Sequence, residues 1–136
     1  MANVFPHPDS DMFFIKDNTF RIEKSPVHES VKSNGIKVVE FIRVKENELI
    51  FVEAKTSLHN PEKGEKSGEY FRQEVEEIRD KFIHSLNLFS SIKVGIRDAA
   101  FADDFVLPTK GSLVFVLVVK EHENKDCRII KTTLNG

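Results

Sequence analysis

The most constraining feature of this sequence is SLVFVLVVK, residues 112 to 120, in which seven consecutive residues are apolar and most of those are β-branched. A strand of this kind is buried on both faces, which indicates the centre of a sheet that helices cover. The run LIFV, residues 49 to 52, predicts a second buried strand. A long amphipathic helix is predicted between the two strands, over about 69–92. Its apolar stripe has members three or four residues apart, at Phe71, Val75, Ile78, Phe82, Leu86, Phe89 and Ile92. These features together predict an α/β protein with a single-domain mixed β-sheet flanked by helices.

The other segments complete this order of elements. Residues 1–18 read as an N-terminal arm or a short edge strand, and the core of the one domain, 1–136, is expected over about 19–120. We predict a strand at 19–24, a short helix from Ser25-Pro26 to Asn34-Gly35, a hairpin of 36–44 with the strand that begins at 48, loops at 58–68 and 95–111, and a last strand at 128–132.

The hairpin fixes which residues face one another. Whether its turn has two residues or four, the paired positions sum to 93, so Val44 lies opposite Leu49 and Glu40 opposite Glu53. Residues two apart in a strand share a face, which places Lys55 beside Glu53. Opposed Cβ atoms lie about 5 Å apart, and two carboxylates there must share a proton, find a cation or bind a metal ion.

Composition limits the possible functions. The formal net charge is −2, from 20 basic and 22 acidic residues, so no overall basic character indicates a nucleic-acid binder, although a local basic rim remains possible. The single cysteine, Cys127, excludes an internal disulfide and a cysteine-based zinc cluster. Neither a signal segment nor an apolar run of roughly 18 residues is present, and we expect a cytoplasmic protein with no membrane association.

The acid of one hairpin strand, followed twelve residues later by Glu53-Ala54-Lys55 in the next, resembles the PD-(D/E)XK nuclease superfamily. The order of elements over about 19–120 is also similar to that restriction-endonuclease-like fold. The resemblance implies an Mg²⁺-dependent (or Mn²⁺-dependent) endonuclease acting on DNA. Glu40, Glu53 and the carbonyl of Ala54 would hold the metal, and Lys55 would orient or deprotonate the attacking water.

Further residues follow from the same resemblance or from proximity along the chain. Glu29, in the short helix, corresponds to an acid found in some members, and Ser57 and Gln73 are possible accessory residues. His59 follows the site in the next loop, where it could reach a substrate phosphate.

A different class of function stays open. The same fold could serve without catalysis as a binding or assembly module that meets a protein partner through its hairpin edge or the 58–68 loop. As an enzyme, a domain of this size is expected to act as a homodimer or as a subunit of a larger complex.

Overall fold

The computed structural model describes residues 4–6, 13–15, 17–97, 101, 105, 107, 111–120 and 127–134. Their strands are β1 (Val4–Pro6), β2 (Phe13–Ile15), β3 (Thr19–Phe20), β4 (Phe41–Lys45), β5 (Glu48–Lys55), β6 (Ser112–Lys120) and β7 (Cys127–Leu134). Their helices are α1 (Pro26–Val31) and α2 (Glu65–Lys93), with single 3-10 turns η1 (Ile22–Lys24), η2 (Lys32–Asn34) and η3 (Pro61–Lys63). The predicted mixed α/β class is confirmed. No helix of the described residues is both long and apolar enough to span a bilayer.

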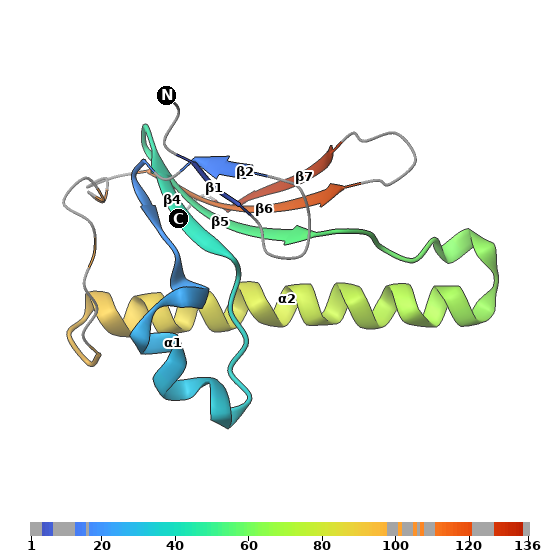
Figure 1. Ribbon diagram of the computed structural model, residues 1–136, viewed down its shortest axis with the longest axis horizontal. Helices are drawn as coiled ribbons and strands as arrows, with labels where there is room; N and C mark the ends of the chain where they lie inside the picture. The colour runs from blue at the N-terminus through green and yellow to red at the C-terminus, as the bar shows by residue number, and fades with distance from the viewer. Residues whose placement is uncertain are drawn as a thin grey trace.

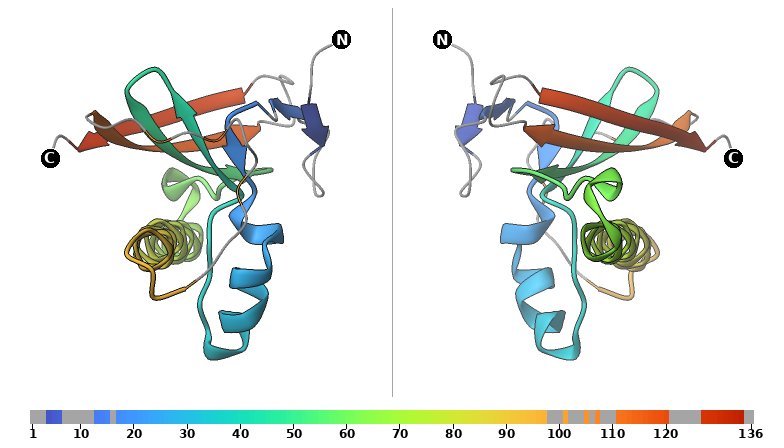
Figure 2. Two further views of the ribbon diagram at one scale, coloured as in Figure 1. Left: turned by 90° about the vertical axis from the view of Figure 1, so that its left-hand side faces the viewer. Right: turned by 90° about the vertical axis from the view of Figure 1, so that its right-hand side faces the viewer.

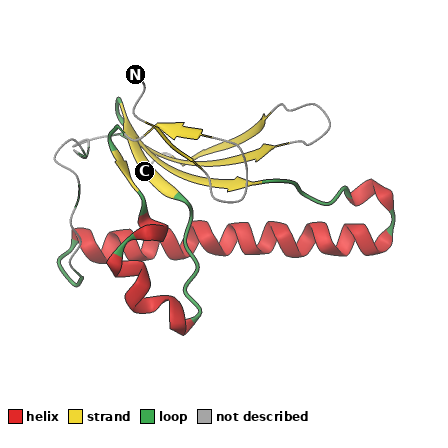
Figure 3. Ribbon diagram, viewed as in Figure 1, coloured by secondary structure: helices red, strands yellow, loops and turns green. Residues whose placement is uncertain are grey.

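The central sheet has the strand order β3-β4-β5-β6-β7. Strands β5 and β6 are parallel and every other neighbouring pair is antiparallel, so the predicted mixed sheet is confirmed. Strand β6 lies between β5 and β7, in the interior position that its apolar run predicts. Because parallel neighbours need a crossover, the chain leaves β5, returns through α2 and enters β6 beside it. Figures 1 and 3 show α2 crossing one face of the sheet as a second layer.

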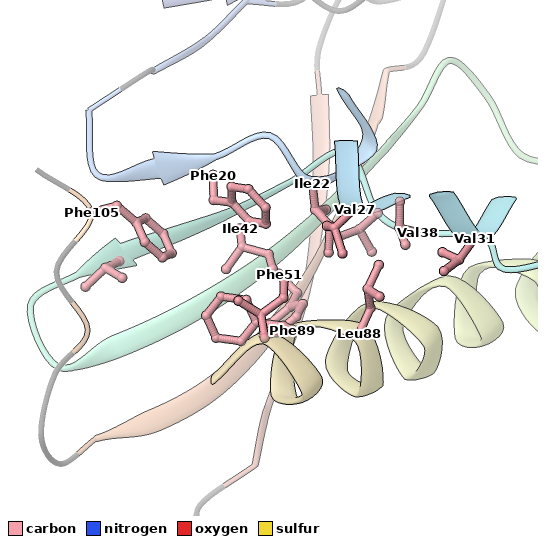
Figure 4. Close-up of a cluster of buried hydrophobic side chains, with 13 residues drawn as sticks. Phe20, Ile22, Val27, Val31, Val38, Ile42, Phe51, Leu88, Phe89 and Phe105 are labelled. Atoms are coloured by element: carbon pink, nitrogen blue, oxygen red, sulfur yellow. The ribbon is translucent and has the colours of Figure 1, made fainter. Parts of the chain in front are cut away.

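The core fills the space between the sheet and the two helices. Phe51 of β5 packs edge-on against Phe89 of α2, with ring centroids 6.0 Å apart, and Leu88 and Ile42 lie in the same cluster. Figure 4 shows these side chains converging between the ribbons. The opposite face of the sheet carries a smaller cluster, in which Phe5 of the β1–β2 ribbon covers its apolar residues. Figure 2 shows this ribbon beside the sheet, on the side away from α2.

The predicted hairpin register is confirmed. Val44 pairs with Leu49 and Phe41 with Val52, and both pairs sum to 93. The turn has two residues, and its first, Glu46, has a positive φ of 55°. The tip of this hairpin lies so close to the start of β6 that a Cβ on Gly111 would collide with the Asn47 carbonyl. Glycine at 111 therefore permits the close approach in which Ser112 N–H donates to Asn47 O at 2.9 Å.

Several predicted boundaries were wrong. Pairing of residues 19–24 stops at Phe20, after which the chain forms η1, and residues 36–39 are irregular where a strand was expected. The predicted loop 58–68 contains η3, and α2 begins at Glu65 instead of near 69. The helix of 25–35 is confirmed: the Ser25 side chain accepts from His28 N–H, and Gly35 ends it with a φ of 80°. The predicted last strand is present and longer, as β7. Most of the predicted loop 95–111 and most of the 1–18 arm lie outside the described residues.

The buried face of α2 agrees with the predicted stripe from Ile78 onward, where Phe89 and Ile92 are also buried. Val75 of the stripe is exposed, whereas Ser85 and Leu88, outside the stripe, are buried. In Figure 1 the N-terminal end of α2 extends beyond the strands of the sheet. Apolar residues at that end have no sheet to cover them.

Candidate functional site

Glu53 is a fully buried carboxylate in the sheet. It lies two residues after Phe51 in β5 and therefore points toward α2, where Lys81 Nζ donates to Glu53 Oε2. The other oxygen, Glu53 Oε1, is buried and has no hydrogen-bond partner among the described residues. A buried polar atom without a partner is costly, so this oxygen marks a place where a further donor or a cation fits.

Glu40 lies next to this carboxylate. It immediately precedes β4, and continuing the register by one residue sets it opposite Glu53. Its side chain shares a hydrogen bond with Glu23 of η1. Burial, reinforced by the carboxyl groups of Glu23 and Glu53, raises the pKa of Glu40 to about 8. Near neutral pH the Glu40 carboxyl therefore holds a proton, which lowers the total negative charge of Glu23, Glu40 and Glu53.

The Glu53–Lys81 pair has opposing electrostatic influences. Burial raises the pKa of Glu53, although Lys81 and, more weakly, Lys55 act in the opposite direction. Burial also opposes the charge on Lys81, but the carboxyl groups of Glu53, Glu40 and Glu23 outweigh it, so the pKa of Lys81 is raised. Lys81 is thus held in its charged form, with its side chain 26 % exposed.

The site lies where β4 and β5 part. The β4–β5 ladder ends at Phe41 and Val52, while β5 stays paired with β6 as far as Lys55. The segment that bears Glu40 is held by α2 instead of by β5. Val39 N–H donates to the buried Ser85 Oγ at 2.8 Å, and Lys37 N–H donates to His84 Nδ1 at 3.2 Å. Glu40 therefore lies just outside the β4–β5 ladder, while Glu53 lies in a strand that is still paired with β6.

The structure brings the predicted catalytic residues together. Glu40, Glu53 and Lys55 come from the predicted hairpin, and Glu53 interacts electrostatically with each of the other two. Lys55 is half-buried at the last position of β5, on the same face as Glu53. The side chain of Ala54 points to the opposite face, where it packs with Phe41 and Val52, so only its backbone can serve the site.

The three accessory residues do not join this group. Glu29 is exposed and pairs with Lys32 at 2.9 Å, one turn along its own helix. Ser57 and Gln73 are both exposed. Their predicted part in the site has no contact to support it.

Sequence reasoning missed Glu23, Lys81 and Ser85. Glu23 was assigned to a strand, so its place in η1 beside Glu40 was not expected. Lys81 and Ser85 could have been found from the spacing of α2, because residues 78, 81, 85, 88 and 92 follow each other at intervals of three or four. Two members of this set, Lys81 and Ser85, are polar, so the set is less apolar than the predicted stripe and is not chosen as the buried face.

The donor set suits a hard divalent cation that keeps several waters. Two carboxylates and a carbonyl are the kind of ligands Mg²⁺ takes from proteins, and the unpartnered Glu53 Oε1 is one suitable oxygen. As the side chains stand, no three His, Cys, Asp or Glu groups of the described residues are arranged to hold a metal ion. Comparisons of the chain with protein-family models, with curated proteins and with solved structures found no match.

Proposed function

We propose that this protein is a metal-dependent phosphodiester hydrolase, an endonuclease-like enzyme acting on DNA, on a restriction-endonuclease-like fold. The observation that carries the proposal is the proximity of Glu40 and Glu53 just beyond the end of the β4–β5 ladder, with Lys55 on the same face as Glu53 and a buried Glu53 oxygen without a partner among the described residues. The parallel β5–β6 crossover through α2 supports the fold.

The charges of the group favour a cation. The carboxyl groups of Glu23, Glu40 and Glu53 interact electrostatically with Lys81, and that of Glu53 also interacts with Lys55. Carboxyl groups in such numbers must keep a proton or bind a positive ion. A divalent cation would take the place of the proton on Glu40.

Each residue then has a specific role. Glu40, Glu53 and the Ala54 carbonyl would hold Mg²⁺ or Mn²⁺, and Glu23 would lose its hydrogen bond with the protonated Glu40 when the ion binds. When bound, the ion would polarise the scissile phosphate and stabilise the charge that develops on it. Lys55 would orient the attacking water or accept its proton. Lys81 would continue to balance the negative charge of Glu53.

A second candidate is a non-catalytic binding or assembly module that meets a protein partner. The Lys81–Glu53 ion pair favours it, because an ammonium group already neutralises the carboxylate that a metal would need. In this case the buried pair would only fix the packing of α2 on the sheet.

Cleavage assays separate the two candidates. Plasmid and linear duplex DNA would be incubated with the wild type, Glu53→Gln and Lys55→Ala in Mg²⁺, in Mn²⁺ and in EDTA. We expect metal-dependent nicking by the wild type and a loss of at least about 100-fold in either variant.

Thermal melts with the same ions serve as an independent measurement. Binding to the folded state raises the melting temperature of the wild type, and Glu53→Gln should remove that rise. Glu77→Gln, an exposed glutamate on α2, is the matched control. Absence of both cleavage and a metal-dependent shift in the wild type would favour the binding module.

A further inference from the structure

A second polar group lies beyond the end of β5. Glu74 of α2 accepts two hydrogen bonds through one oxygen, Oε1, from the His59 backbone N–H at 2.9 Å and from the His59 ring Nδ1 at 2.8 Å. The Glu74 side chain is 18 % exposed, while that of His59 is 50 % exposed. Among the described residues, no hydrogen-bond partner contacts the other ring nitrogen, Nε2. The carboxylate thus fixes the orientation of a ring whose second nitrogen is available to a ligand.

This pair lies on the same side of α2 as the acidic site. Glu74 and Lys81 are seven residues apart, which is two turns and about 10 Å along the helix at 1.5 Å per residue. Lys81 contacts Glu53, and Glu74 contacts His59, six residues further along the chain from Glu53. The segment from β5 to η3 therefore runs along α2, as Figure 1 shows, and the two polar groups follow one line.

The surroundings of His59 suit an anion. Its ring lies against Tyr70, with centroids 4.9 Å apart, and Lys66 Nζ lies 5.9 Å from the Tyr70 ring. Glu74 contacts the His59 ring at Nδ1, so its carboxylate lies on the side of the ring opposite to Nε2. Glu74 is thus the charged group that contacts His59 among the described residues, and Lys66 lies by the Tyr70 ring. Glu62 and Lys63 are exposed on η3, which begins two residues after His59 in the chain.

We infer that His59 is a phosphate-binding residue that holds the DNA backbone beside the reacting phosphate, with Glu74 as its positioning residue. The inference rests on the proposed function, which supplies the DNA and the reacting phosphate. In the imidazolium form, Nδ1–H donates to Glu74 and Nε2–H donates to a phosphate oxygen. In the neutral form with the proton on Nδ1, Nε2 has only a lone pair and cannot donate.

Two substitutions separate this role from a structural one. Asparagine can place an N–H group near the position of the histidine Nδ1, so His59→Asn keeps a donor for Glu74 and loses Nε2. Glutamine reaches the position of Nε2, so His59→Gln keeps a donor for the phosphate. The binding of a fluorescein-labelled 12-base-pair duplex would be measured by fluorescence anisotropy in Ca²⁺, at pH 6.0, with thermal melts of each variant.

At pH 6.0 we expect His59→Asn to bind the duplex about tenfold more weakly than the wild type, with an unchanged melting temperature, because one charge-assisted hydrogen bond is lost. The slope of log affinity against log salt should fall by about one. His59→Gln should bind more tightly than His59→Asn. Equal affinity of the wild type and His59→Asn at pH 6.0 would overturn the inference, as would a wild type that does not bind the duplex.

The proposed function fails by a different result. If Glu53→Gln does not change metal-dependent cleavage, the acidic site is not catalytic, whereas the His59 variants would still report their own effect on duplex affinity. If Glu53→Gln abolishes cleavage and His59→Asn changes neither affinity nor salt dependence, the acidic site stands and the phosphate contact does not.

Discussion

At the scale of single residues, the site is defined by the different surroundings of the two oxygens of the Glu53 carboxylate. Lys81 neutralises one oxygen of Glu53, and burial leaves the other without a partner. Glu40, beside it, keeps its proton because Glu23 and Glu53 add to the effect of burial. Removing Lys81 would leave the buried charge of Glu53 uncompensated. Lys81 is therefore needed for stability whether the Glu53–Lys81 pair belongs to a catalytic site or is purely structural.

The raised pKa of Glu40 makes stability depend on pH. This carboxyl titrates at about 8 in the folded protein, against 4.5 for an unperturbed glutamate. Between these values the folded state holds a proton that the unfolded state lacks, so the free energy of unfolding falls as the pH rises. Glu40→Gln removes this proton equilibrium. We expect the variant to match the wild type near pH 5 and to exceed it by about 1 to 3 kcal/mol near pH 9, a range reduced for solvent screening.

Urea unfolding at pH 5, 7 and 9 measures this difference, with Glu77→Gln as an exposed control. A Glu40→Gln effect of the same size at all three pH values would show that Glu40 does not titrate as described.

At the scale of elements, α2 supplies a hydrogen bond to the segment before β4 that a neighbouring strand would otherwise supply. The segment before β4 has no ladder to β5, and the Ser85 hydroxyl accepts from its Val39 N–H. The sequence predicted β5, β6, the hairpin register and the existence of α2, because the apolar runs and the position of the polar turn determine them. The contact face of α2 was only partly predictable from apolarity. Its N-terminal end extends past the sheet (Figure 1), and Lys81 and Ser85 are polar residues whose partners lie on distant segments.

The role of Ser85 can be measured. Ser85→Ala leaves the buried Val39 N–H without an acceptor, and we expect a loss of about 1 to 3 kcal/mol in the free energy of unfolding. Ser91→Ala, on the same helix, removes only a bond to the Leu88 carbonyl one turn back, and it should cost less than about 0.5 kcal/mol. Urea unfolding of both variants gives the comparison. Similar losses in the two would mean that the hydrogen bond to Val39 adds nothing to stability.

At the scale of the whole molecule, the sheet is covered on two sides by different means. Helix α2 and α1 cover one face, and the β1–β2 ribbon covers part of the other. Sequence patterns predicted the helical layer. They predicted the ribbon only as an arm or an edge strand, because its strands have three residues each and its partner face consists of residues far along the chain.

The ribbon contributes to stability through Phe5. This side chain is 4 % exposed, packs edge-on against Phe41 at 5.4 Å and lies under Arg21, whose Cζ is 4.1 Å from the ring centroid. Phe5→Ala should lower the free energy of unfolding by about 3 kcal/mol, since it opens a cavity. The neighbouring Val4, 37 % exposed, is the control, and Val4→Ala should have little effect on the same urea transition. Equal effects of the two variants would mean that the ribbon does not close this face.

The length of α2 has a consequence for how such a chain can vary. One helix supplies the cation for Glu53, the acceptor for Val39 and the carboxylate for His59, each on the same side and separated by whole turns. Adding or deleting one residue between 74 and 81 would turn one half of the helix by about 100° against the other. Changes in helix length between these residues should therefore come in steps of about seven or eleven residues, since such steps complete nearly whole turns and keep Glu74 and Lys81 on one side of the helix.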